Sequence, residues 1–198
     1  MGKRGFDLLF ASTGLIVLLP VFVVIAILIK VDSPGAVFFR QERVGLRGRT
    51  FRIHKFRTMA TDAASDGPQL TVGADRRITR VGRMLRRYKA DELPQLVDVV
   101  RGDMSLVGPR PEVPRYVACY PPDIRDLVLS VRPGITDRAS IEFRQESALL
   151  STAQDPETAY VRDILPIKLS FYLEYVRQHS FLGDLKIIFA TIREIFRG

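Results

Sequence analysis

The feature that most constrains this chain is a nearly unbroken apolar run from Leu8 to Ile29. At about 1.5 Å per residue, a helix over this run is just long enough to span the hydrocarbon core of a bilayer. The run is too long for a signal peptide and lacks the small-residue cleavage site. Pro20 near its middle removes a helical hydrogen bond and crowds the carbonyl of Ile16, so the sequence predicts a kink.

Two topologies fit this segment. In one, a kinked helix spans the membrane, because proline is tolerated in membrane helices. In the other, the segment re-enters and leaves on one side. Lys3 and Arg4 precede the run, and Lys30, Arg40 and Arg43 follow it. Positive residues favour the cytoplasmic side, and here both flanks carry them, which favours the re-entrant form.

The chain length suits one anchor over residues 1–31 and one catalytic domain over residues 32–198. The patterning predicts an α+β fold, mainly helical, with an N-terminal re-entrant membrane helix–break–helix, a short β-hairpin and amphipathic interfacial helices. Strands over Val37–Phe39 and Thr50–Ile53 form the hairpin, and residues 60–75 form a loop. Helices are predicted over residues 78–89, 94–100, 113–120, 124–131, 166–179 and 184–197.

The C-terminal region has two interpretations. Apolar residues of the 184–197 segment follow helical spacing, with Lys186, Arg193 and Arg197 on one stripe. Such a helix lies in a membrane interface or packs on the domain core. Tyr172 and Tyr175 upstream suit a membrane interface.

Positive charge is concentrated in two stretches. The chain carries a net charge of +8, yet residues 40–57 alone hold +6 and residues 76–89 hold +7. Local cationic stretches fit phosphate ligands, an anionic membrane or nucleic acid. The single cysteine, Cys119, excludes an internal disulfide and is expected in the core. The two histidines lie too far apart in sequence to favour a zinc site.

Two adjacent carboxylates, Asp91 and Glu92, follow the second cationic stretch. Pro94 suits the first turn of a helix and disfavours helical conformation at Leu93, which predicts a helix boundary there. Neighbouring side chains serve one site only at such a break, because on regular elements they diverge. One carboxylate could attack while the other holds a hard cation. The alternative is a solvated capping pair.

Four motifs together resemble the bacterial sugar transferase family, the monotopic phosphoglycosyl transferases that start glycan assembly on a polyprenyl phosphate. The resemblance covers the chain from about residue 3 to its end. Its motifs are Lys55–Met59, Asp91–Leu96, Gly102–Pro111 and Val131–Thr136. Residues 137–147, DRASIEFRQES, depart from the pattern of relatives, so their sugar specificity does not transfer.

The resemblance implies a reaction. A UDP-sugar donates its sugar-1-phosphate to polyprenyl (undecaprenyl) phosphate and UMP leaves, which initiates glycoconjugate or exopolysaccharide synthesis. Asp91 attacks the phosphorus next to the sugar and forms a covalent aspartyl intermediate, and Glu92 with Asp91 holds Mg²⁺. The implied location of the protein is the cytoplasmic face of the bacterial inner membrane, in contact with its lipids. The substrate-binding candidates are Lys55, Arg57, Arg86, Pro109, Arg110 and Arg132.

Two other function classes are weaker. A membrane-tethered module binding nucleic acid or anionic lipid would use the cationic stretches, but they hold few aromatic residues and no nucleic-acid-binding signature, so no nucleic-acid partner is predicted. A glycosidase needs carboxylates separated by roughly 5 Å or more, which adjacent residues rarely provide. The sequence does not indicate an oligomeric state.

Overall fold

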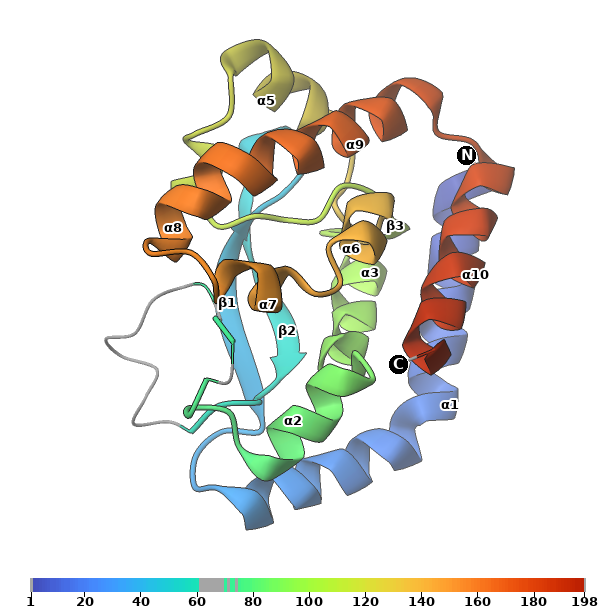
Figure 1. Cartoon of the computed structure of the whole chain (residues 1–198). Helices are drawn as coiled ribbons and strands as arrows, with labels where there is room; N and C mark the ends of the chain where they lie inside the picture. Colours follow the sequence, from blue (N-terminus) through green and yellow to red (C-terminus); the bar gives the residue numbers. More distant parts are fainter. Residues whose placement is uncertain (1, 61–69, 71, 74, 198) are drawn as a thin grey trace.

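The structure, a computed structural model, describes residues 2–60, 70, 72–73 and 75–197. The predicted mainly helical α+β fold is confirmed: helices surround two small sheets (Figure 1). In one sheet, β1 (Phe38–Val44) pairs antiparallel with β2 (Thr50–Phe56). In the other, β3 (Ser105–Val107) pairs parallel with β4 (Gly134–Thr136). The predicted hairpin is therefore confirmed with longer strands, joined through the 3₁₀ turn η1 (Leu46–Gly48).

The apolar N-terminal run lies in one helix, α1 (Gly2–Asp32), with Pro20 inside it. Among the described residues, α1 is the one helix whose length and composition would allow it to cross a membrane. The helix is continuous through Pro20, so the predicted break takes the form of a bend. Figure 1 shows α1 running beside α10 and then turning to pass beneath α2.

Both halves of α1 pack on the domain. In the first half, Ala11 is buried against Ile53 and Val99. In the second half, Ile25 and Ile29 join a separate apolar cluster that includes Phe56 and Leu85. The opposite face of α1 leaves large apolar side chains exposed, including Leu9, Ile16, Val17, Leu19, Val24 and Ile27.

The two ends of α1 are also tied to the domain by polar contacts. Lys3 Nζ donates to Val107 O (3.1 Å) and to Asp184 Oδ2 (2.5 Å). At the other end, Asp32 accepts a hydrogen bond from the backbone N–H of Val81 (2.9 Å). A straight helix of this length would place its ends about 46 Å apart at about 1.5 Å per residue. The bend and these contacts keep the whole helix against the domain.

The predicted helices are found, mostly shorter than predicted. The stretch 94–100 is divided between η3 and α3, and the last two helices match closely. The two helices predicted over 113–120 and 124–131 are found as two shorter helices. The remaining helical elements are α2 (Arg80–Arg87), η3 (Ala90–Gln95), α3 (Leu96–Arg101), α4 (Pro114–Val117), α5 (Pro122–Val128), α6 (Arg138–Glu142), α7 (Glu146–Leu150), α8 (Pro156–Ala159), η4 (Tyr160–Ile164), α9 (Leu165–Gln178) and α10 (Phe181–Arg197). The predicted loop over residues 60–75 lies largely outside the described residues.

The main core lies between β1, α4, α5, η4 and α9, and it corrects two sequence expectations. Tyr172 is only 1% exposed and packs inside this core, so its assignment to a membrane interface is wrong. Tyr175 donates to Val107 O and Asp184 and is likewise occupied within the protein. Cys119 is exposed and therefore is not a core residue.

The C-terminal helix α10 lies beside the first half of α1 (Figure 1). Asp184 and Ile187 are buried toward the domain. The outer face of α10 exposes Phe181, Leu182, Phe189, Ile192 and Phe196. The helix therefore packs on the domain by one side and presents an apolar face on the other, and interfacial membrane binding by that face stays a prediction.

Candidate active site

The adjacent carboxylates lie in η3, between α2 and α3. Lys89 precedes η3 in the left-handed conformation (φ 54°), which turns the chain sharply out of α2. The predicted boundary at Leu93 is wrong, because Pro94 is inside η3 and α3 begins at Leu96. The tight 3₁₀ turn still supplies the predicted break in regular helix, and it buries both Asp91 and Glu92.

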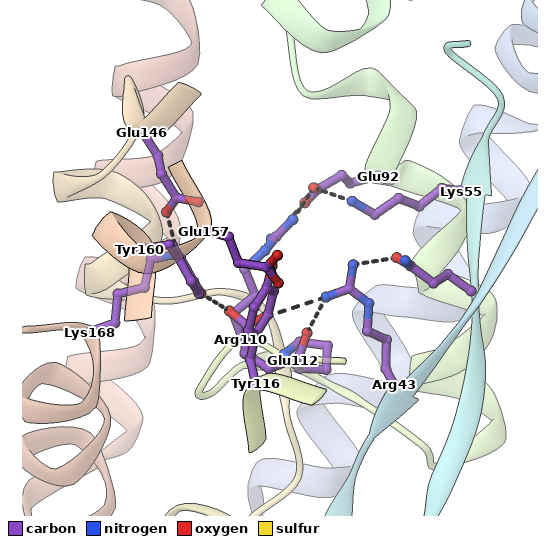
Figure 2. A network of polar contacts seen from close by, with 12 residues as sticks. Arg43, Lys55, Glu92, Arg110, Glu112, Tyr116, Glu146, Glu157, Tyr160 and Lys168 are labelled. Carbon is purple, nitrogen blue, oxygen red and sulfur yellow. Dashed lines mark hydrogen bonds and ion pairs between the residues drawn. The ribbon is translucent and has the colours of Figure 1, made fainter. Parts of the chain in front are cut away.

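Glu92 is bound by two cations. Lys55 Nζ donates to its Oε1 (2.8 Å), and Arg110 donates to both oxygens, with Nη1 3.0 Å from Oε2 (Figure 2). Burial alone would favour the neutral acid, but Arg110 and Lys55 outweigh it and hold the pKa of Glu92 well below its usual range. Glu92 raises the pKa of the Arg110 guanidinium in turn. Glu92 is therefore a fixed anion that positions two cations.

Asp91 is in the opposite situation. Its Oδ1 is buried and has no hydrogen-bond partner among the described residues. Burial raises the pKa of Asp91, and the neighbouring charge of Glu92 adds to the rise. Lys55 and Arg86 act against the rise without cancelling it. A buried acceptor without a donor costs about 1–3 kcal/mol, so the fold holds Asp91 Oδ1 in an energetically costly position.

The partners of Glu92 come from rigid elements. Lys55 lies on β2, and Arg110 follows β3 in the irregular segment Gly108–Pro111. Gly108 approaches the neighbouring chain so closely that a Cβ there would lie 2.5 Å from Arg132 O. Pro109 is buried, and its carbonyl accepts from Gly134 N (3.0 Å). Pro109 therefore fixes the segment that carries Arg110.

Arg86 is placed by a close contact between α2 and the end of the hairpin. A Cβ on Gly82 would lie 2.1 Å from Thr58 O, so only glycine allows this approach. Arg86 Nε then donates to Thr58 Oγ1 (2.9 Å). The contact holds the Arg86 guanidinium on the same cavity as Asp91.

These groups line a cavity of about 400 Å³, here called the carboxylate cavity. It brings together Asp91, Glu92, Lys55 and Arg86, four of the residues that the sequence singled out. Its full lining is Lys55, Arg86, Arg87, Lys89, Asp91, Glu92, Arg144 and Gln145. Arg87 and Lys89 belong to the second cationic stretch, so the charge pattern of the sequence pointed to them. Arg144 and Gln145 lie in the 137–147 segment, and no local pattern pointed to them.

Two of the predicted substrate-binding arginines lie elsewhere. Arg57 is buried and donates to Ser33 O, Ser33 Oγ and Pro34 O, just after the last turn of α1. It therefore binds carbonyl groups at the end of α1. Arg132 donates to Gly102 O (2.8 Å) and does not line the carboxylate cavity. The structure therefore does not bring either side chain to the carboxylate cavity, and substrate binding by Arg57 and Arg132 stays a prediction.

The described residues hold no group of three or more His, Cys, Asp or Glu side chains suited to a metal ion. The two carboxylates remain the candidate ligands. Asp91 fits, because its Oδ1 is a buried oxygen ligand without a donor. Glu92 fits less well, since both of its oxygens already accept from cations. This donor set suits Mg²⁺ only if phosphate oxygens of a ligand complete the coordination.

The fold and site define a mainly helical α+β protein with a long apolar N-terminal helix and a buried carboxylate pair in a cationic cavity. A family model described as bacterial sugar transferase matches residues 1–198, and the chain belongs to that family. The chain is 38% identical to an Aeromonas hydrophila UDP-N-acetylgalactosamine-undecaprenyl-phosphate N-acetylgalactosaminephosphotransferase, covering 99% of this chain and 44% of that protein.

Two further relatives differ in length. The Escherichia coli K12 UDP-glucose:undecaprenyl-phosphate glucose-1-phosphate transferase is 36% identical over 99% of this chain and 40% of its own length. The exopolysaccharide production protein PSS of Rhizobium leguminosarum bv. phaseoli is 37% identical over 99% of this chain and 96% of its own length. The chain thus spans less than half of the first two relatives and nearly all of the third.

Proposed function

We propose that this protein is a membrane-bound phosphoglycosyl transferase that moves a sugar-1-phosphate from a UDP-sugar to polyprenyl phosphate. The observation that carries the proposal is the unpartnered, buried Asp91 Oδ1 in a cavity lined by cations. The names of two relatives support the substrate classes, because each name contains both a UDP-sugar and undecaprenyl phosphate. The name of a third supports a place in exopolysaccharide production.

The chemistry proceeds through Asp91 in two displacements. An Asp91 oxygen attacks the donor phosphorus that bears the sugar, and the bond from this phosphorus to the oxygen bridging to UMP breaks. UMP leaves with that electron pair, and a sugar-phosphoryl aspartate remains. An oxygen of the lipid phosphate then attacks the same phosphorus, and the Asp91 carboxylate is released as the leaving group.

The raised pKa of Asp91 has a role in this scheme, because a more basic carboxylate is the stronger nucleophile once ionised. Lys55, Arg86 and Lys89 line the same cavity and attract the donor diphosphate. Glu92 fixes Lys55 and Arg110 in place through its ion pairs. The two carboxylates thus have separate tasks: one reacts and the other orders the cations.

Mg²⁺ belongs to the proposal as a cofactor. When bound, it would neutralise charge on the diphosphate and stabilise the leaving group. Asp91 and, less fully, Glu92 are the residues of this chain that would hold it, with donor phosphates supplying the other oxygens. The cationic side chains act on the same phosphates from the remaining sides.

The proposed location is the cytoplasmic face of the bacterial inner membrane, with α1 as a re-entrant anchor in contact with lipid. Both ends of α1 bind the domain, and its outer face is apolar, which supports entry and exit on one side. Cysteine labelling from outside intact cells tests this, with single cysteines at positions 2 and 33 in a Cys119→Ser background. Both positions are expected to stay unlabelled; labelling at position 2 alone would establish a spanning helix.

The activity is tested with detergent-solubilised protein, undecaprenyl phosphate, Mg²⁺ and a panel of UDP-sugars. The expected result is release of UMP and formation of a lipid-linked sugar with at least one donor. A membrane-tethered binding module would release no UMP with any donor. Rapid quenching with a radiolabelled sugar should also trap label on the protein, and this label should be lost in Asp91→Asn.

A further inference from the structure

A second polar cavity lies next to the carboxylate cavity and has no assigned role. It encloses about 270 Å³ and is here called the Glu112 cavity. Segments distant in sequence build it, from β1 through the Gly108–Pro111 segment to α7, η4 and α9. The lining residues used below are Arg43, Arg110, Glu112, Phe143, Tyr160 and Lys168.

Glu112 is the centre of this cavity. It is 7% exposed, and its Oε1 accepts from Tyr160 OH (2.6 Å). Tyr160 OH in turn lies 3.4 Å from Lys168 Nζ, and Lys168 pairs with Glu146. Figure 2 shows this chain of contacts beside the Glu92 network. Glu112 therefore has one oxygen fixed by a hydroxyl that is itself held in place.

The other side of Glu112 is not fully used. Its Oε2 lies 3.7 Å from Arg43 Nη1, beyond hydrogen-bond distance, and Arg43 Nη1 and Nη2 bind Pro111 O and Gln41 instead. Arg43 Nε is buried and has no partner among the described residues. An acceptor with spare capacity thus lies beside a donor without a partner, and leaving such groups unpaired is costly.

The Glu112 cavity adjoins Asp91 through shared side chains. Lys89 and Arg144 line both cavities. Arg110 lines the Glu112 cavity while its guanidinium binds Glu92 in the carboxylate cavity. A group bonded to the phosphorus that Asp91 attacks is therefore within reach of the Glu112 cavity.

We propose that the Glu112 cavity binds the sugar ring of the donor. Glu112 Oε2 accepts from one sugar hydroxyl, and Arg43 Nε donates to a hydroxyl oxygen. A sugar ring suits this pair because each hydroxyl both donates and accepts. Tyr160 is a positioning residue that fixes the Glu112 carboxylate. This inference rests on the proposed function and adds to it the part of the chain that reads the sugar.

The same observations disfavour uridine as the occupant. The Tyr116 and Tyr160 rings pack on each other (4.8 Å between centroids), and Lys168 Nζ lies 6.0 Å from the centroid of Phe143. Each of these contacts covers part of a ring, which leaves less aromatic surface on which a uracil base could stack. The volume is also below the range of about 300–1,000 Å³ typical of pockets for drug-sized ligands, which fits one ring of the donor and not the whole molecule.

The test compares kcat/KM for a UDP-sugar with the inhibition constant of UDP, which lacks the sugar. Glu112→Gln keeps the side-chain shape but weakens the acceptor, so kcat/KM should fall about tenfold or more while UDP inhibition changes less than about twofold. Tyr160→Phe should raise KM and reduce discrimination among UDP-sugars, with a smaller effect on kcat. It also keeps the test valid if Glu112→Gln fails to fold.

The matched control is Tyr172→Phe. Tyr172 is as buried as Tyr160, but its hydroxyl has no partner among the described residues and it does not line the cavity. Tyr172→Phe should leave both kcat/KM and the inhibition constant of UDP unchanged. Unchanged kcat/KM in the Glu112 and Tyr160 variants, or a parallel loss of UDP affinity, would overturn the sugar assignment alone. Absence of UMP release by the unmodified protein with every donor would instead overturn the proposed function and this inference with it.

Discussion

Two regions of this protein bury carboxylates beside cations, and they differ in how completely those carboxylates are satisfied. At the α1–α10 junction, Asp184 accepts from Lys3 and from Tyr175 OH (3.0 Å). Asp7 accepts there from Ser105 Oγ (2.8 Å) and Leu106 N. In the carboxylate cavity, Asp91 keeps an oxygen with no partner among the described residues although cations line the same space.

The difference separates carboxylates that are fully paired in the fold from one that is not. Paired groups at the junction hold the N-terminus of α1 and α10 to the domain. The unpaired oxygen of Asp91 contributes no such contact and raises the free energy of the folded state. Within the cavity the division repeats, since Glu92 is paired and Asp91 is not. The following predictions test whether pairing distinguishes the two roles.

The largest effect is expected from Asp91→Asn. Loss of the nucleophile should lower kcat by about 10³-fold or more, because removing a nucleophile rarely leaves more activity. The same change removes a buried, unpaired charge, so the apparent Tm should rise. Turnover and thermal unfolding of the purified protein measure the two effects. Near-wild-type turnover would remove Asp91 from the mechanism.

Glu92→Gln should damage both stability and activity. It leaves Lys55 and Arg110 without their common anion, and breaking a buried ion pair in this way costs about 3–5 kcal/mol. Denaturant unfolding and kcat at a temperature where the variant is folded measure the two parts. Activity of the unmodified protein should also disappear in excess EDTA and return with Mg²⁺; full activity in EDTA would exclude the proposed cofactor.

Asp184→Asn is the matched change at the junction. It should lower the free energy of unfolding by about 1–3 kcal/mol, because Lys3 and Tyr175 lose a charged partner. Turnover per folded molecule should change less than about threefold, since Asp184 does not line the carboxylate cavity. A loss of kcat comparable with that of Asp91→Asn, in folded protein, would contradict the division between paired and unpaired carboxylates.

The smallest effect concerns pH. Asp91 has a folded-state pKa above its ordinary value of 3.8, so the folded protein holds this proton more tightly than the unfolded chain. Stability from this group is therefore present at low pH and is lost as pH rises through the folded pKa. The Tm advantage of Asp91→Asn over the unmodified protein should grow as pH rises above the ordinary aspartate pKa of 3.8, because position 91 can lose a proton only when it is aspartate. A constant advantage would contradict the raised pKa.

Local sequence was sufficient for several parts of this molecule. The long apolar run, the hairpin and the amphipathic C-terminal helix follow from hydrophobic periodicity, and all three are found. The Asp91–Glu92 pair also stood out, because adjacent carboxylates serve one site only at a break in regular structure. The position of that break was missed, since the 3₁₀ turn depends on how α2 and α3 pack and Pro94 tolerates either arrangement.

The cationic side chains show where local reasoning stopped. Arg57 and Arg110 both lie in basic or proline-rich motifs, yet Arg57 binds the chain just after α1 while Arg110 binds Glu92. Arg144 reaches the carboxylate cavity from a segment with no recognisable signal. A charge pattern identifies candidates for phosphate binding, but it cannot distinguish an arginine that binds backbone carbonyls from one that faces a cavity.

The sequence by itself determined that this chain has a long apolar helix, two concentrated cationic stretches and a carboxylate pair at a turn, because these are properties of neighbouring residues. The tertiary structure alone decided which carboxylate is paired. Lys55 and Arg110 are 37 and 18 residues from Glu92 in the chain and meet it only through the packing of β2 and the segment after β3. Burial and long-range contacts shift the pKa of each group in opposite directions, and those contacts leave Asp91 Oδ1 without a partner among the described residues.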